Sequence, residues 1–99
     1  MRPIYSAQLD KMRPVVVLTR DLVHPHLTRV TVAPITTTIR GLSTEIIVGP
    51  ANGLSHRCVV SCDNIVTVPK SALRRPIGFL LPTQEGALTA AIHAAFDLD

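Results

Sequence analysis

Residues 13–18 read Arg-Pro-Val-Val-Val-Leu, and this stretch decides the fold class. Its continuous β-branched run predicts a strand that is buried on both faces. A second stretch, residues 32–38, reads Val-Ala-Pro-Ile-Thr-Thr-Thr and predicts the end of another buried strand. The first stretch begins with an arginine and the second ends in a threonine cluster. Both side chains can donate hydrogen bonds to phosphate, so the pair suggests phosphodiester chemistry without a metal ion.

The rest of the chain predicts short strands, because alternating and β-branched runs are separated by Gly-Pro, Asn-Gly and other polar turns. The expected strands cover residues 3–7, 14–19, 28–34, 45–48, 57–60, 65–68 and 76–80. Polar connectors are expected at residues 8–12, 21–26, 36–41 and 61–64, with a helical turn at 70–74. The proline in the last run predicts an edge position or a strand start.

The C-terminal residues change to a helical period. Thr83 is the expected N-cap, and Glu85 falls in the first turn, where the helix dipole favours an acid. The helix should run for about three to four turns and pack an aliphatic stripe on the sheet. The residues of this stripe are Leu88, Ile92, Ala95 and Phe96. The predicted fold is mainly β with a C-terminal helix: a small, strongly bent antiparallel sheet or open barrel, in one domain over residues 1–99.

The amino-acid composition restricts which residues can build the hydrophobic core and indicates which kinds of partner the chain can bind. Of the 99 residues, 46% are apolar but only 3% are aromatic, so Val, Ile, Leu and Ala must build the core. This aliphatic content is high for a small monomer, which favours a homodimer. The net charge of +3 is compatible with nucleic acid, and a solvated basic surface is the alternative.

The two cysteines, Cys58 and Cys62, help to predict the cellular compartment of the protein and whether it binds a metal ion. The N-terminus does not resemble a signal peptide, and no apolar run reaches the roughly 20 residues of a spanning helix. We therefore expect a cytoplasmic protein with reduced thiols. His56 and the two cysteines lack a fourth ligand and match no common zinc spacing, so no metal or cofactor is expected. Buried packing of the cysteines is the favoured interpretation.

Several residues carry candidate chemistry, each with a plainer alternative. Pro14 holds Arg13 extended, where its guanidinium can bind phosphate bidentately or simply pair with a surface carboxylate. Hydroxyls at 36–38 can donate to phosphate, although threonine-rich strand ends are common. Asp63 can act as a base, contact a nucleobase, or satisfy backbone donors in an Asx-turn.

The histidines suggest a second possible chemistry. His24 and His26 share a loop and could form an acid–base ribonuclease pair, but solvated loop residues are the simpler interpretation. His93 is expected to be a partly exposed helix residue.

Taken together, these segments resemble the MazF/PemK family, the toxins of bacterial type II toxin–antitoxin systems. The matching segments occur in the family's order over nearly the whole chain: residues 13–18, 32–36, 58–68 and 77–78. The resemblance implies an SH3-like barrel with a C-terminal helix, a homodimer, and a metal-independent endoribonuclease that cuts single-stranded RNA at short sequences. Cleavage by the ribose 2′-hydroxyl would leave a 2′,3′-cyclic phosphate and a 5′-hydroxyl, and would inhibit translation and growth.

The resemblance also assigns residues and partners. Arg13 would stabilise the charge on the five-coordinate phosphorus and Thr36 would hold a phosphate oxygen. Further candidates for RNA contact are Thr37, Thr38, Arg40, Ser61 and Asp63. An acidic, partly disordered MazE-like antitoxin is the implied partner. A non-catalytic, CcdB-like poison of DNA gyrase, acting through its C-terminal helix, is the alternative function.

Two features depart from the family's usual pattern. The loop at residues 8–12 is short where relatives often carry a long, Gly-rich loop. Ser61 stands where some relatives carry an arginine two residues before the turn aspartate, so an Arg/Asp mechanism is not expected there.

Overall fold

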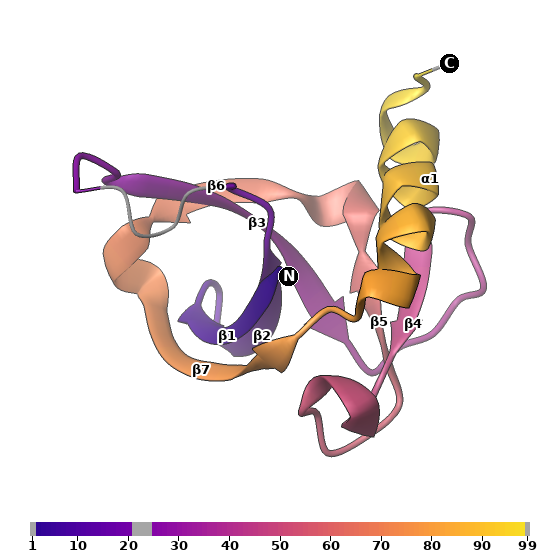
Figure 1. The fold of residues 1–99 in the computed structure, drawn as a ribbon, viewed down its shortest axis with the longest axis horizontal. Coiled ribbons are helices and arrows are strands. Elements are labelled where there is room, and N and C mark those ends of the chain that lie inside the picture. The colour runs from indigo at the N-terminus through magenta and orange to yellow at the C-terminus, as the bar shows by residue number, and fades with distance from the viewer. Residues whose placement is uncertain (1, 21–24, 99) are drawn as a thin grey trace.

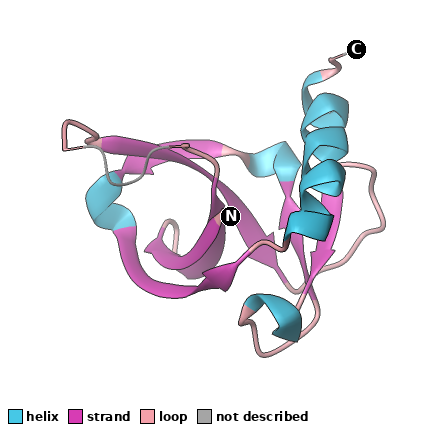
Figure 2. Cartoon of the chain, in the orientation of Figure 1, coloured by secondary structure: helices cyan, strands magenta, loops and turns pink. Residues whose placement is uncertain are grey.

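The computed structural model describes residues 2–20 and 25–98, which form strands, short 3-10 helices and one α-helix (Figures 1 and 2). The strands are β1 (Pro3–Gln8), β2 (Met12–Val17), β3 (Arg29–Thr36), β4 (Glu45–Val48), β5 (Cys58–Ser61), β6 (Val66–Pro69) and β7 (Leu73–Phe79). The 3-10 helices are η1 (Pro50–Asn52), η2 (Cys62–Asn64), η3 (Lys70–Ala72) and η4 (Pro82–Gln84). Helix α1 (Glu85–Phe96) is the last element.

All the strand pairs are antiparallel, and together they form one bent sheet. The strand order is β4-β5-β3-β2-β1-β7, and β6 pairs with β3 beside this path. Strands β1, β2, β3, β6 and β7 curl around a common interior, while β4 and β5 lie beside α1 (Figure 1). Among the described residues no ladder joins the outer strands β4 and β7, so the sheet is not closed. The predicted mainly-β fold with a C-terminal helix is confirmed.

Strand β2 separates two hydrophobic clusters. Val16 belongs to the larger cluster, which also contains Leu88 of α1. Val15 and Val17 belong to the smaller cluster, inside the curl of the sheet. All three valines have 0% exposure, so the predicted burial of this strand on both faces is confirmed.

Some strands are longer than predicted, because residues outside the predicted range still pair with a neighbouring strand. Residues 45–48 match β4 as predicted. β2 begins at Met12 rather than residue 14, because Met12 and Arg13 pair with β1. β7 begins at Leu73 rather than residue 76, since Leu73 pairs with Ala7, and the predicted helical turn is therefore shortened to η3. β7 is the last strand of the sheet order, as its proline predicted. Residues 21–24 of the predicted loop lie outside the described part of the chain.

The prediction of Thr83 as helix N-cap is wrong. Pro82 starts the 3-10 helix η4, which includes Thr83, and Gln84 takes the N-cap position without a side-chain cap. Phe96 is also not a core residue, because α1 extends beyond the sheet at its C-terminal end and leaves this side chain 56% exposed (Figure 1). In the described residues, no helix is long and apolar enough to cross a membrane.

Candidate functional site

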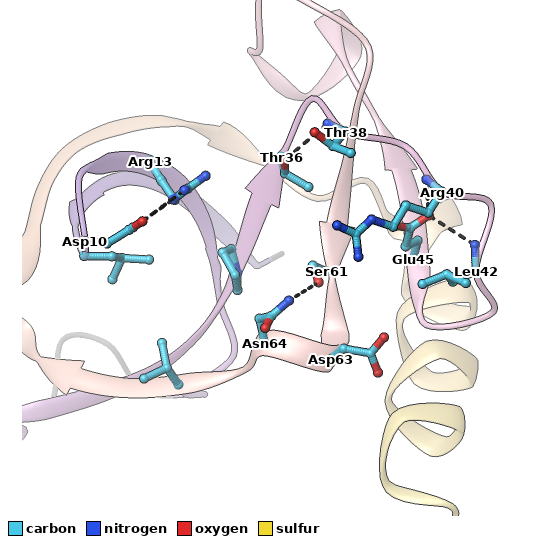
Figure 3. A pocket seen from close by; sticks show the side chains of 13 residues that line it. Asp10, Arg13, Thr36, Thr38, Arg40, Leu42, Glu45, Ser61, Asp63 and Asn64 are labelled. Atoms are coloured by element: carbon cyan, nitrogen blue, oxygen red, sulfur yellow. Dashed lines mark hydrogen bonds and ion pairs between the residues drawn. The ribbon is translucent and has the colours of Figure 1, made fainter.

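A pocket of about 610 Å³ opens where β2 and β3 separate (Figure 3). The ladder between these strands pairs Val15 with Pro34. Continuing this register toward the end of β3 brings Arg13 opposite Thr36. Beyond the ladder β3 pairs with β5 instead, so the strands diverge and both side chains line the opening.

The pocket brings together most of the residues that the sequence singled out. The candidates that line it are Arg13, Thr36, Thr38, Arg40, Ser61 and Asp63. Thr37 is exposed and is not among the lining residues, because the chain bends at this residue directly after β3 ends at Thr36. The structure thus separates Thr37 from the rest of its threonine cluster.

Arg13 is held by Asp10, a residue that the sequence analysis missed. Its Nε donates to Asp10 Oδ1 at 2.9 Å and its Nη2 donates to Oδ2 at 3.1 Å (Figure 3). Asp10 lies in the short connector between β1 and β2, and an acid three residues before a strand-start arginine was the available signal. The carboxylate pairing considered as an alternative for Arg13 is therefore present, and it orients the guanidinium at the edge of the pocket.

This pairing predicts an unusual titration of Asp10. The hydrogen bond from Arg13 lowers the pKa of Asp10 to about 2. A depressed acid pKa means that the ion pair is fully present above the ordinary pKa of about 4 and is lost as the pH falls through about 2. We expect Arg13→Ala to return the Asp10 midpoint to about 4, measured by NMR of the carboxyl carbon. A midpoint that stays near 2 in this variant would show that another group holds the carboxylate.

Hydrogen bonds from backbone N–H groups to side-chain oxygens fix the opposite wall of the pocket, which is the loop between β3 and β4. Glu45 Oε1 accepts from the backbone N–H groups of Arg40 and Leu42, each at 3.1 Å. Thr36 Oγ1 accepts from the backbone N–H of Thr38 at 3.2 Å, which leaves the hydroxyl hydrogen of Thr36 available to a ligand. The Arg40 guanidinium extends from this loop into the pocket (Figure 3).

The η2 turn forms the far end of the pocket. Asn64 Nδ2 donates to Ser61 Oγ at 2.8 Å, and Thr44 Oγ1 donates to Asp63 Oδ2 at 2.6 Å. Between these residues Cys62 points into the core, where burial raises the pKa of its thiol to about 11 with a smaller contribution from Asp63. Cys62 is therefore a neutral packing residue at pH 7.

The other sequence candidates do not gather at this site. Cys58 and Cys62 are free and buried, which confirms that they pack in the core. Within residues 2–20 and 25–98, no three His, Cys, Asp or Glu side chains are placed to hold a metal ion. His24 lies outside the described residues, and neither His26 nor His93 lines the pocket.

Comparisons with known proteins agree with this fold. The family model for the PemK-like, MazF-like toxin of type II toxin–antitoxin systems matches residues 2–96. The endoribonuclease MazF3 of Mycobacterium tuberculosis (strain CDC 1551 / Oshkosh) is 64% identical over 99 residues, covering 100% of this chain and 96% of the relative. The structure of Mycobacterium tuberculosis toxin MazF-mt6 matches with a TM-score of 0.95 and 63% identity over 99% of each chain.

A second solved structure, an endoribonuclease from a mycobacterial species in complex with its cognate antitoxin, is more distant. It matches with a TM-score of 0.85 and 26% identity over 98% of this chain and 93% of that one. The family match spans nearly the whole chain, including both strands that form the pocket. The chain therefore belongs to the PemK-like, MazF-like toxin family of type II toxin–antitoxin systems.

Proposed function

We propose that this chain is a sequence-specific endoribonuclease toxin, a single unit over residues 1–99, that cleaves single-stranded RNA without a metal ion. The observation that supports this proposal is that Arg13 and Thr36 line the same pocket. A cation and a hydroxyl donor that face one pocket can both donate hydrogen bonds to the oxygens of one phosphate. The relatives that are named endoribonucleases support RNA as the polymer to which this phosphate belongs.

The proposed reaction is an internal transfer. The ribose 2′-oxygen attacks phosphorus and loses its proton, the P–O5′ bond breaks, and O5′ takes up a proton. The products are a 2′,3′-cyclic phosphate and a 5′-hydroxyl end. Arg13 stabilises the extra charge on the five-coordinate phosphorus, and the Thr36 hydroxyl donates to a phosphate oxygen. A guanidinium pKa above about 12 makes an electrostatic role for Arg13 more effective than proton transfer.

RNA must compete with Asp10 for Arg13. The Asp10 and Arg13 side chains are 68% and 29% exposed, and exposed ion pairs in water are weak. A phosphate can therefore replace the carboxylate and take over the oriented guanidinium. Thr38 and Arg40 would contact the RNA from the loop wall, and Ser61 and Asp63 from the η2 turn. Thr37, which lies outside the pocket, would contact only the flanking RNA.

The proposed partners are a second copy of the chain and a cognate MazE-like antitoxin, and the proposed compartment is the cytoplasm. Large apolar side chains remain exposed on the described surface, among them Ile47 at 44% and Phe79 at 50%, and a homodimer would cover part of this area. Arg13 and Arg40 are the side chains of the pocket with which an acidic antitoxin segment would pair, in competition with the carboxylates of Asp10, Glu45 and Asp63 in the same lining. The mycobacterial relative solved with its cognate antitoxin supports this arrangement.

The proposal is tested by incubating the purified protein with RNA in EDTA and mapping the new ends. We expect cleavage at a short recurring sequence, with 2′,3′-cyclic phosphate and 5′-hydroxyl ends. Cleavage that EDTA abolishes would contradict the metal-free reaction. Growth arrest with intact RNA and trapped gyrase–DNA complexes would instead identify a gyrase poison.

A further inference from the structure

A second group of cations lies outside the pocket, where β6 ends and β7 begins. The group consists of Arg29, Lys70, Arg74 and Arg75, and we call it the basic rim. We propose that the basic rim binds phosphates of the RNA that flanks the cleavage site. This inference rests on the proposed function, because it assigns a second contact surface to the same RNA substrate.

The pairing of β3 with β6 brings these cations to one side of the molecule. Arg29 pairs with Pro69 in the ladder, and Lys70 directly follows Pro69 in the chain. The backbone N–H of Lys70 donates to the carbonyl of Thr28 at 2.8 Å, which extends this contact by one residue. The 3-10 helix η3 then leads directly into β7, whose first residues include the other two arginines of the rim. In Figure 1 the start of β7 lies at the left, below the paired strands β3 and β6.

The charge of the basic rim is not balanced within the described part of the chain. The ion pairs there involve Arg2 and Arg13, and none involves a residue of the rim. Nη2 of Arg29 donates to the carbonyl of Thr67 at 3.3 Å, which holds this side chain across the ladder and leaves most of its N–H groups for a ligand. Both arginines of β7 are exposed. The rim therefore presents charged hydrogen-bond donors to a polyanion.

Strand β6 connects the pocket to the basic rim. Val66, the first residue of β6, lines the pocket, and the strand ends directly before Lys70. Four residues of extended chain span about 13 Å, so an RNA strand that leaves the pocket along β6 reaches the rim. Leu9, which also lines the pocket, packs against the same hydrophobic cluster as Leu73, the residue before Arg74. This continuity favours the RNA held in the pocket over an unrelated acidic protein as the ligand of the rim.

Contacts outside the pocket make binding depend on the length of the RNA. A short RNA that covers only the cleavage sequence occupies the pocket, whereas about ten further nucleotides on each side add about 34 Å of stacked strand. The longest extent of the structure is 35 Å, so the longer RNA covers the pocket and the rim together. Each phosphate contact on a single strand contributes about 0.7 to the slope of log affinity against log salt concentration. The rim therefore predicts tighter and more salt-dependent binding of the longer RNA.

The test measures binding of the two RNAs by fluorescence anisotropy at several salt concentrations, with deoxyribose at the cleavage site so that the RNA stays intact. The double variant Arg74→Gln/Arg75→Gln should weaken binding of the longer RNA by about tenfold at about 0.1 M salt and lower its salt slope by about 1.4. Affinity for the short RNA, and its rate of cleavage, should change by less than about twofold. Both substituted residues are exposed, so the fold is retained.

Arg57→Glu is the matched control, because it lowers the net charge by the same two units at an exposed residue. Arg57 lies between η1 and β5, and in Figure 1 this segment lies far from the start of β7. The control should keep the tighter binding of the longer RNA.

Two results would overturn the inference while RNA cleavage stands: a wild-type protein that binds both RNAs alike, and a rim variant that still binds the longer RNA more tightly. A rim variant that loses affinity for a polyglutamate peptide but not for RNA would also overturn it, since the rim would then serve an acidic protein. Failure of the proposed function is distinguishable. In that case no RNA would be cleaved, while the rim variant would still lose its tighter binding of long RNA.

Discussion

Replacing Arg13 by alanine is expected to slow RNA cleavage by about 100- to 1,000-fold, the usual effect of removing one charge-stabilising donor from a reaction centre. Arg13 lines the pocket together with Thr36, and its guanidinium is held in place by Asp10. Because the stabilised charge develops only in the transition state, kcat should fall more than RNA affinity. Single-turnover cleavage and anisotropy binding with one RNA would separate the two effects.

Arg13→Lys sharpens this test. Lysine keeps the positive charge but replaces the planar guanidinium by a point charge that cannot bind two oxygens at once. We expect it to retain affinity for RNA while recovering only a small part of the lost rate. Arg57→Ala is the control, since Arg57 is exposed and does not line the pocket. An Arg13→Ala protein that keeps more than a tenth of the wild-type rate would contradict a catalytic role for this residue.

Arg13 and Thr36 could be predicted as pocket residues from the sequence, because each lies at the end of a strongly patterned strand. A β-branched run fixes which residues of β2 and β3 enter the ladder, and antiparallel register then places the flanking residues opposite one another. Family resemblance added Ser61, the last residue of the buried strand β5, whereas Asp63 was already a candidate because it lies in the polar turn after that strand. The strand patterns that carry these residues are readable in the local sequence, and the antiparallel pairing of β2, β3 and β5 then brings the strand ends to one pocket.

The residues that support the pocket could not be predicted in the same way. Asp10 reaches Arg13 only because the connector between β1 and β2 is a tight turn. Glu45 was recognised only as a strand residue, yet its side chain holds the loop through two backbone N–H groups. Such contacts depend on the path of irregular loops, for which residue spacing carries little information.

The start of α1 shows how tertiary contacts override a local signal. Thr83 has the side chain of a good N-cap, but Gln84 Oε1 accepts from both Leu81 N and Asn52 Nδ2, at 2.8 and 2.7 Å. Asn52 is only 2% exposed and also donates to the carbonyl of Phe79 at 2.9 Å. The helix therefore begins where this buried amide network places it, and the network joins η1, β7 and α1.

The same junction gives the largest expected effect on stability, in Gly78→Ala. A Cβ at Gly78 would overlap the backbone carbonyl of Asn52, where a rigid neighbour rather than a flexible side chain must move. We expect the free energy of unfolding to fall by about 3 kcal/mol, a large part of the 5–15 kcal/mol typical of a domain. At this chain length the melting temperature should drop by more than about 10 °C, measured by circular dichroism.

Gly86→Ala is the matched control, since it makes the same chemical change at an exposed position of α1. A Cβ there would meet no atom within 4 Å, so only the helix propensity changes. This variant should gain roughly 0.5–1 kcal/mol, the opposite sign to Gly78→Ala. If both variants melted within a few degrees of the wild-type protein, the close approach of β7 to η1 would not be a constraint on the fold. If Gly78→Ala alone were destabilised, with RNA cleavage kept at low temperature, the junction would affect the stability of the fold and not the pocket.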